Sequence, residues 1–368
     1  MLGKKQSLFD MPSLKTKPSD DVVEVALFGK GVGECIVLHL GCGRYVTIDS
    51  FVNSETNRPI ALDYLESMNV SAESIDCVVV THWHRDHVLG IAELVKSVSS
   101  SARFVMPAVV NDECFTKFIA VSDVQLKGQS PAAEFHAALK MISERKLRII
   151  LASNDKIIIC NQIASSDKGE QSANLYSLSP NDEQMLEYLS YLKKRTDKVV
   201  DRPSYTFAEE NDISTALWLD FVMDKVLLGG DLGISGWNAI VNSRAVSGRA
   251  SLFKVPHHGS ATGHLDSVWN EMLTEKQVSI LSVYSPSGLP KEEDKRRIKE
   301  RSRLMVVAGE QAGVIKRPDF FKKLHRFSSV QLRPLDTNIG MVRARKSMTG
   351  TSDWTIECFG EVENASGV

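Results

Sequence analysis

The feature that most constrains this chain is a heptapeptide, Thr-His-Trp-His-Arg-Asp-His at residues 81–87, which gathers three imidazoles and one carboxylate. An almost wholly apolar run at residues 75–80 precedes it and predicts a strand buried on both faces. Apolar residues with helical spacing follow over residues 88–98. The heptapeptide is therefore expected in a loop that joins a buried strand to a helix.

The spacing of these side chains indicates a metal site. Side chains at positions i and i+2 of a strand end point to one side, so His82 and His84 are placed to share one ion. Asp86 and His87 lie where the chain turns into the helix and are expected to face an adjacent ion. With 9 histidines in 368 residues, a surface cluster or a set of core histidines with this spacing is the less favoured interpretation.

Two later segments supply further candidate ligands. Residues 226–231, Val-Leu-Leu-Gly-Gly-Asp, predict a strand that ends at Asp231, and residues 254–260, Lys-Val-Pro-His-His-Gly-Ser, contain His257 and His258. Each is weak alone, because aspartate after glycine is usually a turn residue and a histidine pair is often part of an exposed loop. Following the heptapeptide in the same chain, both segments are predicted to contribute to the metal site.

In this order the motifs resemble those of the metallo-β-lactamase superfamily of hydrolases, in which His-x-His-x-Asp-His follows a buried strand. The resemblance implies an α/β fold of the αββα four-layer type. It is closest to the cytosolic hydrolase domain of ComEC-type competence proteins and their stand-alone bacterial relatives, through residues 31–38, 48–50, 211–214 and 257–260. The membrane helices that accompany that domain are not found in this sequence, so the resemblance implies the hydrolase chemistry and not DNA transport.

The resemblance also implies two divalent metal ions, zinc or manganese, bridged by Asp231. One ion would be held by His82, His84 and Asn211, and the other by Asp86, His87 and His258. Many dinuclear members have a histidine where this chain has Asn211. An amide oxygen is a poorer zinc ligand than imidazole but suits harder cations such as Mn²⁺. The His82/His84 site is therefore expected to be weak, to prefer Mn²⁺ or to be partly occupied.

Further roles are predicted for residues beside the ions. Asp86 is a candidate to orient the attacking water. The sequence does not decide which neighbouring histidine is the ligand; His258 is favoured because His-Gly-Ser resembles the His-x-Ser of phosphodiesterase members. His257 would then protonate the leaving group or contact phosphate. Ser214 and Ser260 are candidate donors behind the ligands, although a serine after glycine is often a simple turn residue.

Cysteine usage and the chain's first residues predict a cytoplasmic location. Six cysteines without a Cys-x-x-Cys pair are expected to be reduced and mostly buried, Cys35 among them. Residues 1–21 form a polar leader that lacks the apolar segment of a secretory signal. No run approaches the roughly 20 apolar residues of a membrane helix.

Residues 22–368 are expected to form one domain, with an inserted, mainly helical region at about 107–205. Insertions often carry specificity, so this one is the expected docking surface for any protein partner. The net charge of -2 gives no global basic field. Yet residues 291–346 contain 16 Lys and Arg against 7 acidic residues, a net charge of +9 that leaves -11 for the remainder.

Such a basic stretch can contact a polyanion. The alternative interpretation of the stretch is a solvated helix face with ion pairs such as Glu292–Arg296. With the resemblance, it favours a phosphodiesterase or nuclease that acts on nucleic acid or a nucleotide through a metal-activated water. A role in bacterial defence or DNA processing would follow. Two alternatives stay open: a small-molecule hydrolase acting on a thioester, lactone or lactam, and a regulatory subunit that depends on a partner.

Overall fold

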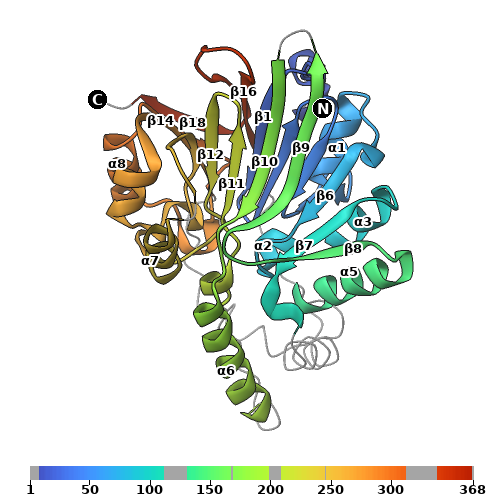
Figure 1. Ribbon diagram of the computed structural model, residues 1–368, viewed down its shortest axis with the longest axis vertical. Helices are drawn as coiled ribbons and strands as arrows, with labels where there is room; N and C mark the ends of the chain where they lie inside the picture. The colour runs from blue at the N-terminus through green and yellow to red at the C-terminus, as the bar shows by residue number, and fades with distance from the viewer. Residues whose placement is uncertain are drawn as a thin grey trace, which may run out of the picture.

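The computed structural model describes residues 8–111, 131–166, 169–198, 209–244, 246–311 and 338–366, and it shows two large sheets packed face to face (Figure 1). The first sheet contains β1 (Val22–Lys30), β2 (Gly33–Leu40), β3 (Tyr45–Ile48), β6 (Ile75–Val79), β7 (Arg103–Pro107), β8 (Arg148–Ala152), β16 (Gly340–Ser347) and β17 (Thr355–Gly360). Its strand order is β17-β16-β1-β2-β3-β6-β7-β8. A separate hairpin pairs β4 (Val52–Asn53) with β5 (Arg58–Pro59).

The second sheet contains β9 (Lys156–Ser166), β10 (Gly169–Ser177), β11 (Leu217–Phe221), β12 (Asp224–Leu228), β13 (Ala250–Lys254), β14 (Leu273–Ser282), β15 (Leu304–Ala308) and β18 (Val362–Ser366). Its strand order is β18-β15-β14-β13-β12-β11-β10-β9. In both sheets the strands near the middle are parallel: β3 with β6 in the first, and β12, β13 and β14 in the second. Parallel strands end at the same sheet edge, so the loops that follow these five strands are brought together there.

Helices cover the outer face of each sheet. Beside the first sheet lie α1 (Ile60–Ser67), α2 (Arg85–Val88), α3 (Ile91–Ser97), α5 (Pro131–Arg145) and α6 (Asp182–Lys198); beside the second lie α7 (Ile234–Ser243) and α8 (Glu292–Glu300). Short 3-10 or π turns cover Leu8–Asp10, Pro12–Lys15, Ala72–Ser74, Ala108–Asn111, Glu209–Ile213, His257–Gly259, Ala261–Gly263, Val268–Met272 and Ser285–Ser287. The result is the αββα four-layer sandwich that the sequence predicts.

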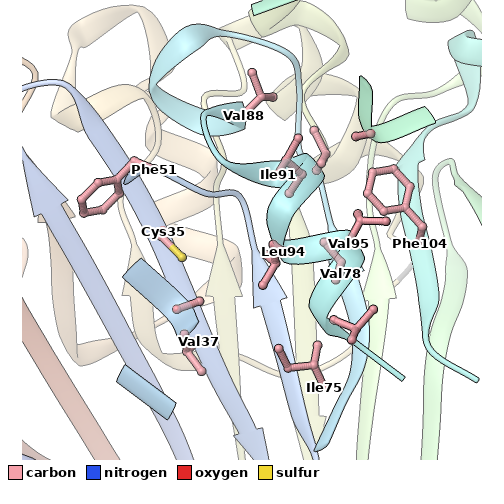
Figure 2. Packing of buried hydrophobic residues seen from close by; sticks show 14 of the residues in the cluster. Cys35, Val37, Phe51, Ile75, Val78, Val88, Ile91, Leu94, Val95 and Phe104 are labelled. Atoms are coloured by element: carbon pink, nitrogen blue, oxygen red, sulfur yellow. The ribbon is translucent and has the colours of Figure 1, made fainter. Parts of the chain in front are cut away.

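Three apolar clusters correspond to the three interfaces between the four layers. One lies between the sheets, and the other two lie between each sheet and its helices. Figure 2 shows Ile91, Leu94 and Val95 of α3 packed over Ile75 and Val78 of β6. The opposite face of β6 contributes Cys77 and Val79 to the cluster between the sheets. This strand is therefore buried on both faces, as its apolar sequence predicts.

The region at about 107–205 differs from the mainly helical insertion that the sequence predicts. Residues 112–130, 167–168 and 199–208 lie outside the described part of the chain. The described part contains α5 and α6, but also β8 of the first sheet and β9 and β10 of the second. β8 and β9 are edge strands, and β10 is paired on both sides, with β9 and β11. Apolar runs near Ile149 and Ile157 predict β8 and β9 as short strands, but the polar sequence of β10 gives no strand pattern.

The polar leader and the cysteines also differ from expectation. Leu14, in the leader, is fully buried in the cluster over the first sheet, and Arg343 of β16 donates hydrogen bonds to the carbonyl oxygens of Ser13 and Leu14. Cys35 is buried as predicted. However, three of the described cysteines are exposed, so "mostly buried" was wrong: Cys42, Cys160 and Cys358. None of the helices in the described ranges is long and apolar enough to cross a membrane.

His39 of β2 is expected to make the stability of the fold depend on pH. Its Nδ1 donates to the carbonyl oxygen of Val22 at 2.8 Å, and its Nε2 accepts from the amide of Gly43 at 3.0 Å. Both nitrogens are therefore used by the neutral ring, and burial lowers the pKa of His39 from 6.5 to about 4. The unfolded chain takes up this proton first, so stability is lost as the pH falls from about 6.5 towards 4.

Urea unfolding at pH 7.5 and pH 5 tests this expectation. Between these values the wild-type chain should lose about 2 kcal/mol more unfolding free energy than His39→Gln, whose side chain cannot be protonated. An equal loss in both proteins would show that His39 does not contribute to the pH dependence.

Candidate metal centre

The predicted ligands come together at the edge where the parallel strands of both sheets end. Residues 82–87 follow β6 and run into α2, Asp231 follows β12, and His258 follows β13. Four ligand-type atoms from these segments converge: Oδ2 of Asp86, Nε2 of His87, Oδ2 of Asp231 and Nε2 of His258. The centre therefore takes side chains from both sheets.

The distances within this first ligand group are short. His258 Nε2 lies 3.2 Å from Asp86 Oδ2 and 3.5 Å from Asp231 Oδ2. His87 Nε2 lies 3.4 Å from both of these carboxylate atoms. All four residues are buried, with exposures of 5% or less. Two imidazoles and two carboxylates at such spacing form a ligand set suited to zinc or another divalent ion.

A second ligand group lies beside the first and shares Asp231 with it. His82 Nε2 and His84 Nδ1 face each other at 3.0 Å, and His82 Nε2 lies 4.0 Å from Asp231 Oδ2. His82 is fully buried, whereas the side chain of His84 is 17% exposed. Asp231 Oδ2 is thus common to both groups, as a bridging carboxylate would be.

Each histidine uses its second ring nitrogen to contact an oxygen behind it. His87 Nδ1 lies 2.7 Å from Asp49 Oδ2, and His258 Nδ1 lies 2.9 Å from Ser282 Oγ, which donates to Glu34. Such contacts fix the orientation and tautomer of a metal-binding imidazole.

The histidines of the second group follow the same pattern. His82 Nδ1 lies 3.0 Å from Thr81 Oγ1 and 3.5 Å from Ser214 Oγ. His84 Nε2 lies 3.6 Å from Glu210 Oε2. All four rings thus present the remaining nitrogen to the ligand groups.

The loop geometry that places Asp231 depends on a glycine. Gly230 has a φ of +51°, and a Cβ at this position would lie 2.6 Å from Ser214 Oγ. That same oxygen accepts a hydrogen bond from the backbone amide of Asp231 at 3.0 Å. A side chain at residue 230 would therefore displace the serine that holds the aspartate, so Gly-Asp is required here for a steric reason.

The charges around the histidines are strongly unbalanced. Five carboxylates are at most 5% exposed: Glu34, Asp49, Asp86, Glu210 and Asp231. Lys254 is the one fully buried ammonium among the described residues of the centre, with its Nζ 2.5 Å from Glu34 Oε1 and 3.7 Å from Asp231 Oδ1. With the imidazoles neutral, four formal negative charges remain, which is the charge that two divalent cations would neutralise.

The protonation equilibria reflect the same imbalance. Burial opposes charge on His87, but Asp86, Asp231 and Asp49 outweigh it and raise its pKa well above 6.5. Burial likewise opposes ionisation of Asp86, yet His87 and His258 hold the pKa of that carboxyl well below its usual range. Both shifts have the same cause, because the buried carboxylates favour positive charge between them.

Unpartnered atoms show that the residues fit metal ions. His87 Nε2 and Asp231 Oδ1 are buried and accept or donate no hydrogen bond. Buried polar atoms are nearly always paired, so such atoms at the convergence of four ligand-type groups indicate a missing electrophile. The donor set of imidazole and carboxylate meets that need with Zn²⁺, and also with Mn²⁺.

The side-chain hydrogen bonds of three predicted site residues, Asn211, His257 and Ser260, go to neighbours outside these groups. Asn211 Nδ2 lies 3.3 Å from His257 Nε2, and His257 Nδ1 lies 2.8 Å from Thr262 Oγ1. The His257 ring is thus held between two neighbours, and burial lowers its pKa. Ser260 Oγ bonds to Thr262 and caps a 3-10 turn. Ser214 does lie behind the ligands, as expected.

Apart from Ser214, the residues behind the histidines were not predicted from the sequence. Glu34, Asp49 and Lys254 lie inside the motifs named above, yet no role was assigned to them. A charged residue within or at the end of an apolar strand was the available signal, because burial of a charge requires a partner. Glu210 lies directly before Asn211 and shows no such pattern.

Comparisons with known proteins agree with this architecture. Residues 29–99 match the sequence model of the metallo-β-lactamase superfamily. Ribonuclease Z of Clostridium botulinum (strain Alaska E43 / Type E3) is 26% identical over 150 residues, which cover 40% of this chain and 42% of that protein. The chain thus matches less than half the length of this curated relative.

Similar solved structures include the metallo-β-lactamase fold protein YhfI from Bacillus subtilis, with 12% identity and a TM-score of 0.39, covering 80% of this chain and 98% of that one. Zn²⁺-bound PqqB from Methylobacterium extorquens is 10% identical with a TM-score of 0.38, covering 76% and 85% of the two chains. Together, the αββα sandwich and the match over residues 29–99 give this chain the metallo-β-lactamase fold, with the candidate ligands of a metal-dependent hydrolase where its sheets meet.

Proposed function

We propose that this protein is a metal-dependent phosphodiesterase or nuclease. The observation that carries the proposal is the pair of ligand groups that share Asp231 Oδ2. Two divalent cations bound there would supply an ionised water and neutralise charge that develops on a phosphoryl oxygen. The ribonuclease Z relative and the resemblance to ComEC-type hydrolase domains support a phosphodiester substrate. The proposal places the enzyme in the cytoplasm, where thiols stay reduced.

The chain's own residues would have separate tasks in this reaction. Asp231 holds the two ligand groups at a fixed separation, and Asp86 orients the attacking water from within the first group. Asn211 remains a proposed ligand beside His82 and His84. His257 is proposed to contact the leaving group or the phosphate, which requires its Nε2 to exchange Asn211 for substrate, since these atoms now lie 3.3 Å apart.

The basic stretch at residues 291–346 contributes less to this proposal than its charge suggests. Its residues 312–337 lie outside the described part of the chain. In the described part, Glu292 pairs with Lys295 and not with Arg296 as predicted. Most basic side chains of this part have acidic partners: Lys295–Glu363, Arg297–Asp294, Arg301–Asp266, Arg303–Asp353, Arg343–Glu357, Arg345–Glu24 and Lys346–Asp224. These pairs favour a largely neutralised surface over a polyanion-binding stripe.

Hydrolysis of phosphodiesters by the metal-loaded protein tests the function. Purified protein loaded with Zn²⁺ or Mn²⁺ should cleave at least one of DNA, RNA, a cyclic nucleotide or bis(p-nitrophenyl) phosphate. Because the water is activated by the ions, EDTA should reduce the rate to background and added Mn²⁺ or Zn²⁺ should restore it. Chromogenic thioester and β-lactam substrates form the comparison. Turnover of these alone, by protein that holds two ions, would refute the proposal.

A further inference from the structure

Glu210 is a buried carboxylate beside the second ligand group with no role in the proposed reaction. It lies in the 3-10 turn Glu209–Ile213 and its exposure is 0%. Oε1 accepts a hydrogen bond from the hydroxyl of Tyr188 on α6 at 3.4 Å. Oε2 has no hydrogen-bond partner and lies 3.6 Å from His84 Nε2. A buried carboxylate atom without a donor is costly, so its position next to an imidazole requires an explanation.

The orientation of His84 determines what Glu210 can do. His84 Nδ1 faces His82 Nε2 at 3.0 Å, so these two nitrogens point to the ion position that they share. Nε2 lies on the far side of the ring and faces Glu210. The carboxylate is therefore behind the histidine and not at the ion position. The same arrangement holds at the first ligand group, where Asp49 lies 2.7 Å behind His87.

We propose that Glu210 is a positioning residue for His84, and that it sets the affinity of the His82/His84 position for a divalent ion. With an ion bound at Nδ1, this carboxylate would accept a hydrogen bond from the Nε2–H of the neutral ring, which would leave Nδ1 as the ligand and fix the plane of the imidazole. This inference rests on the proposed function only in that both require a metal ion. His84 Nε2 lies 3.6 Å from Glu210 Oε2, whereas His87 Nδ1 lies 2.7 Å from Asp49 Oδ2. The longer distance fits the expectation that the His82/His84 position binds its ion more weakly.

The contact also connects α6 to the metal centre. Tyr188 binds Glu210, and the side chain of Gln184 donates to the carbonyl oxygen of Asp212, so two residues of α6 hold the turn that carries Glu210. Figure 1 shows α6 extending away from the sandwich. Tyr188 thus offers a matched control, because its removal changes the surroundings of Glu210 without removing the carboxylate.

Zinc titration against a chromophoric chelator is the test. Wild type should show two binding steps. Glu210→Leu, which has no acceptor, should weaken the step at His82/His84 by about 10-fold to 100-fold, the usual effect of removing a carboxylate behind a metal-binding histidine. Glu210→Gln keeps an uncharged acceptor, so its zinc affinity at His82/His84 should lie between those of wild type and Glu210→Leu. Tyr188→Phe should bind zinc within about threefold of wild type, since the carboxylate remains.

Side-chain ¹H–¹⁵N spectra of the zinc-loaded protein assign the steps. The ring signals of His84 and His258 report which position fills, and His84 should carry its proton on Nε2. In Glu210→Leu that proton should exchange with water faster, whereas the His258 signals should not change. A purely structural role would instead lower the unfolding midpoint of the metal-free protein equally for Glu210→Leu and Tyr188→Phe. It would leave the titration step at His82/His84 and the His84 proton unaltered.

Equal zinc affinities in wild type, Glu210→Leu and Glu210→Gln would overturn the inference. If Glu210→Leu does not fold, Glu210→Gln decides: wild-type affinity together with an unchanged His84 signal overturns it, and a selective loss at His84 supports it. Because these measurements record binding, a protein that holds two zinc ions and cleaves no phosphodiester would refute the proposed function alone.

Discussion

Asp231→Asn is expected to abolish hydrolysis and to lower the metal content of both ligand groups. Asp231 Oδ2 lies 3.4 Å, 3.5 Å and 4.0 Å from the Nε2 atoms of His87, His258 and His82, so one atom serves both groups. An amide has the same size but lacks the charge that holds two cations. The two cations would contribute several kcal/mol of transition-state stabilisation, and its loss would lower the rate by about a thousandfold or more.

Metal analysis by mass spectrometry, the phosphodiester assay and urea unfolding would be run together on this variant. Asp220→Asn is the matched control, since Asp220 is a partly exposed strand aspartate in an ion pair with Lys225. The control should keep its metal and activity. Metal content and rate equal to wild type in Asp231→Asn would contradict the assignment of this residue as the shared ligand.

Lys254→Met is expected to be the most destabilising single change proposed for this chain. Lys254 is fully buried at the end of β13, and its Nζ bonds to Glu34 Oε1 and to the carbonyl oxygen of Gly230. Burial disfavours the ammonium, but Glu34 and Asp231 outweigh it and raise the pKa of Lys254. Methionine would leave Glu34 buried without a counter-charge, which typically costs about 3–5 kcal/mol.

Urea unfolding of metal-free protein would measure this cost. Lys225→Met serves as the control, because Lys225 is 22% exposed and its pair with Asp220 should be worth less than about 1 kcal/mol. The double variant Lys254→Met/Glu34→Gln should recover part of the loss, since it removes the unpaired charge. Similar losses in Lys254→Met and Lys225→Met would contradict a buried ion pair at the base of the metal centre.

The sequence predicted the parts of the centre that depend on local geometry. His82, His84, Asp86 and His87 lie within six residues, so strand spacing and the turn into α2 alone bring them together. The preference for His258 over His257 concerns neighbouring residues, and the structure places only His258 with Asp86 and Asp231. The αββα layers followed from the resemblance alone.

Apart from that of Ser214, the contacts behind the ligands could not be predicted in this way. Ser282 and Glu34 are 248 residues apart in the chain, and they meet only because β14 and β2 face each other across the sandwich. Glu210 pairs with His84 through a turn held by α6, and no periodicity marks that contact. Of the outer strands, β8 and β9 contain apolar runs near Ile149 and Ile157 that predict short strands, whereas β10 lacks the continuous apolar run that identified β6.

Because the ligands are divided between two sheets, a bound ion would also affect the stability of the fold. The histidines at 82–87 belong to the first sheet, whereas Asp231 and His258 belong to the second, so neither half alone contains a complete ligand set. An ion bound between them would act as a crosslink between the two layers. It would favour the docked state over any state in which the sheets are apart, by an amount that grows with the logarithm of free metal concentration. In this fold, docking of the two sheets and assembly of the candidate ligand groups are therefore the same event.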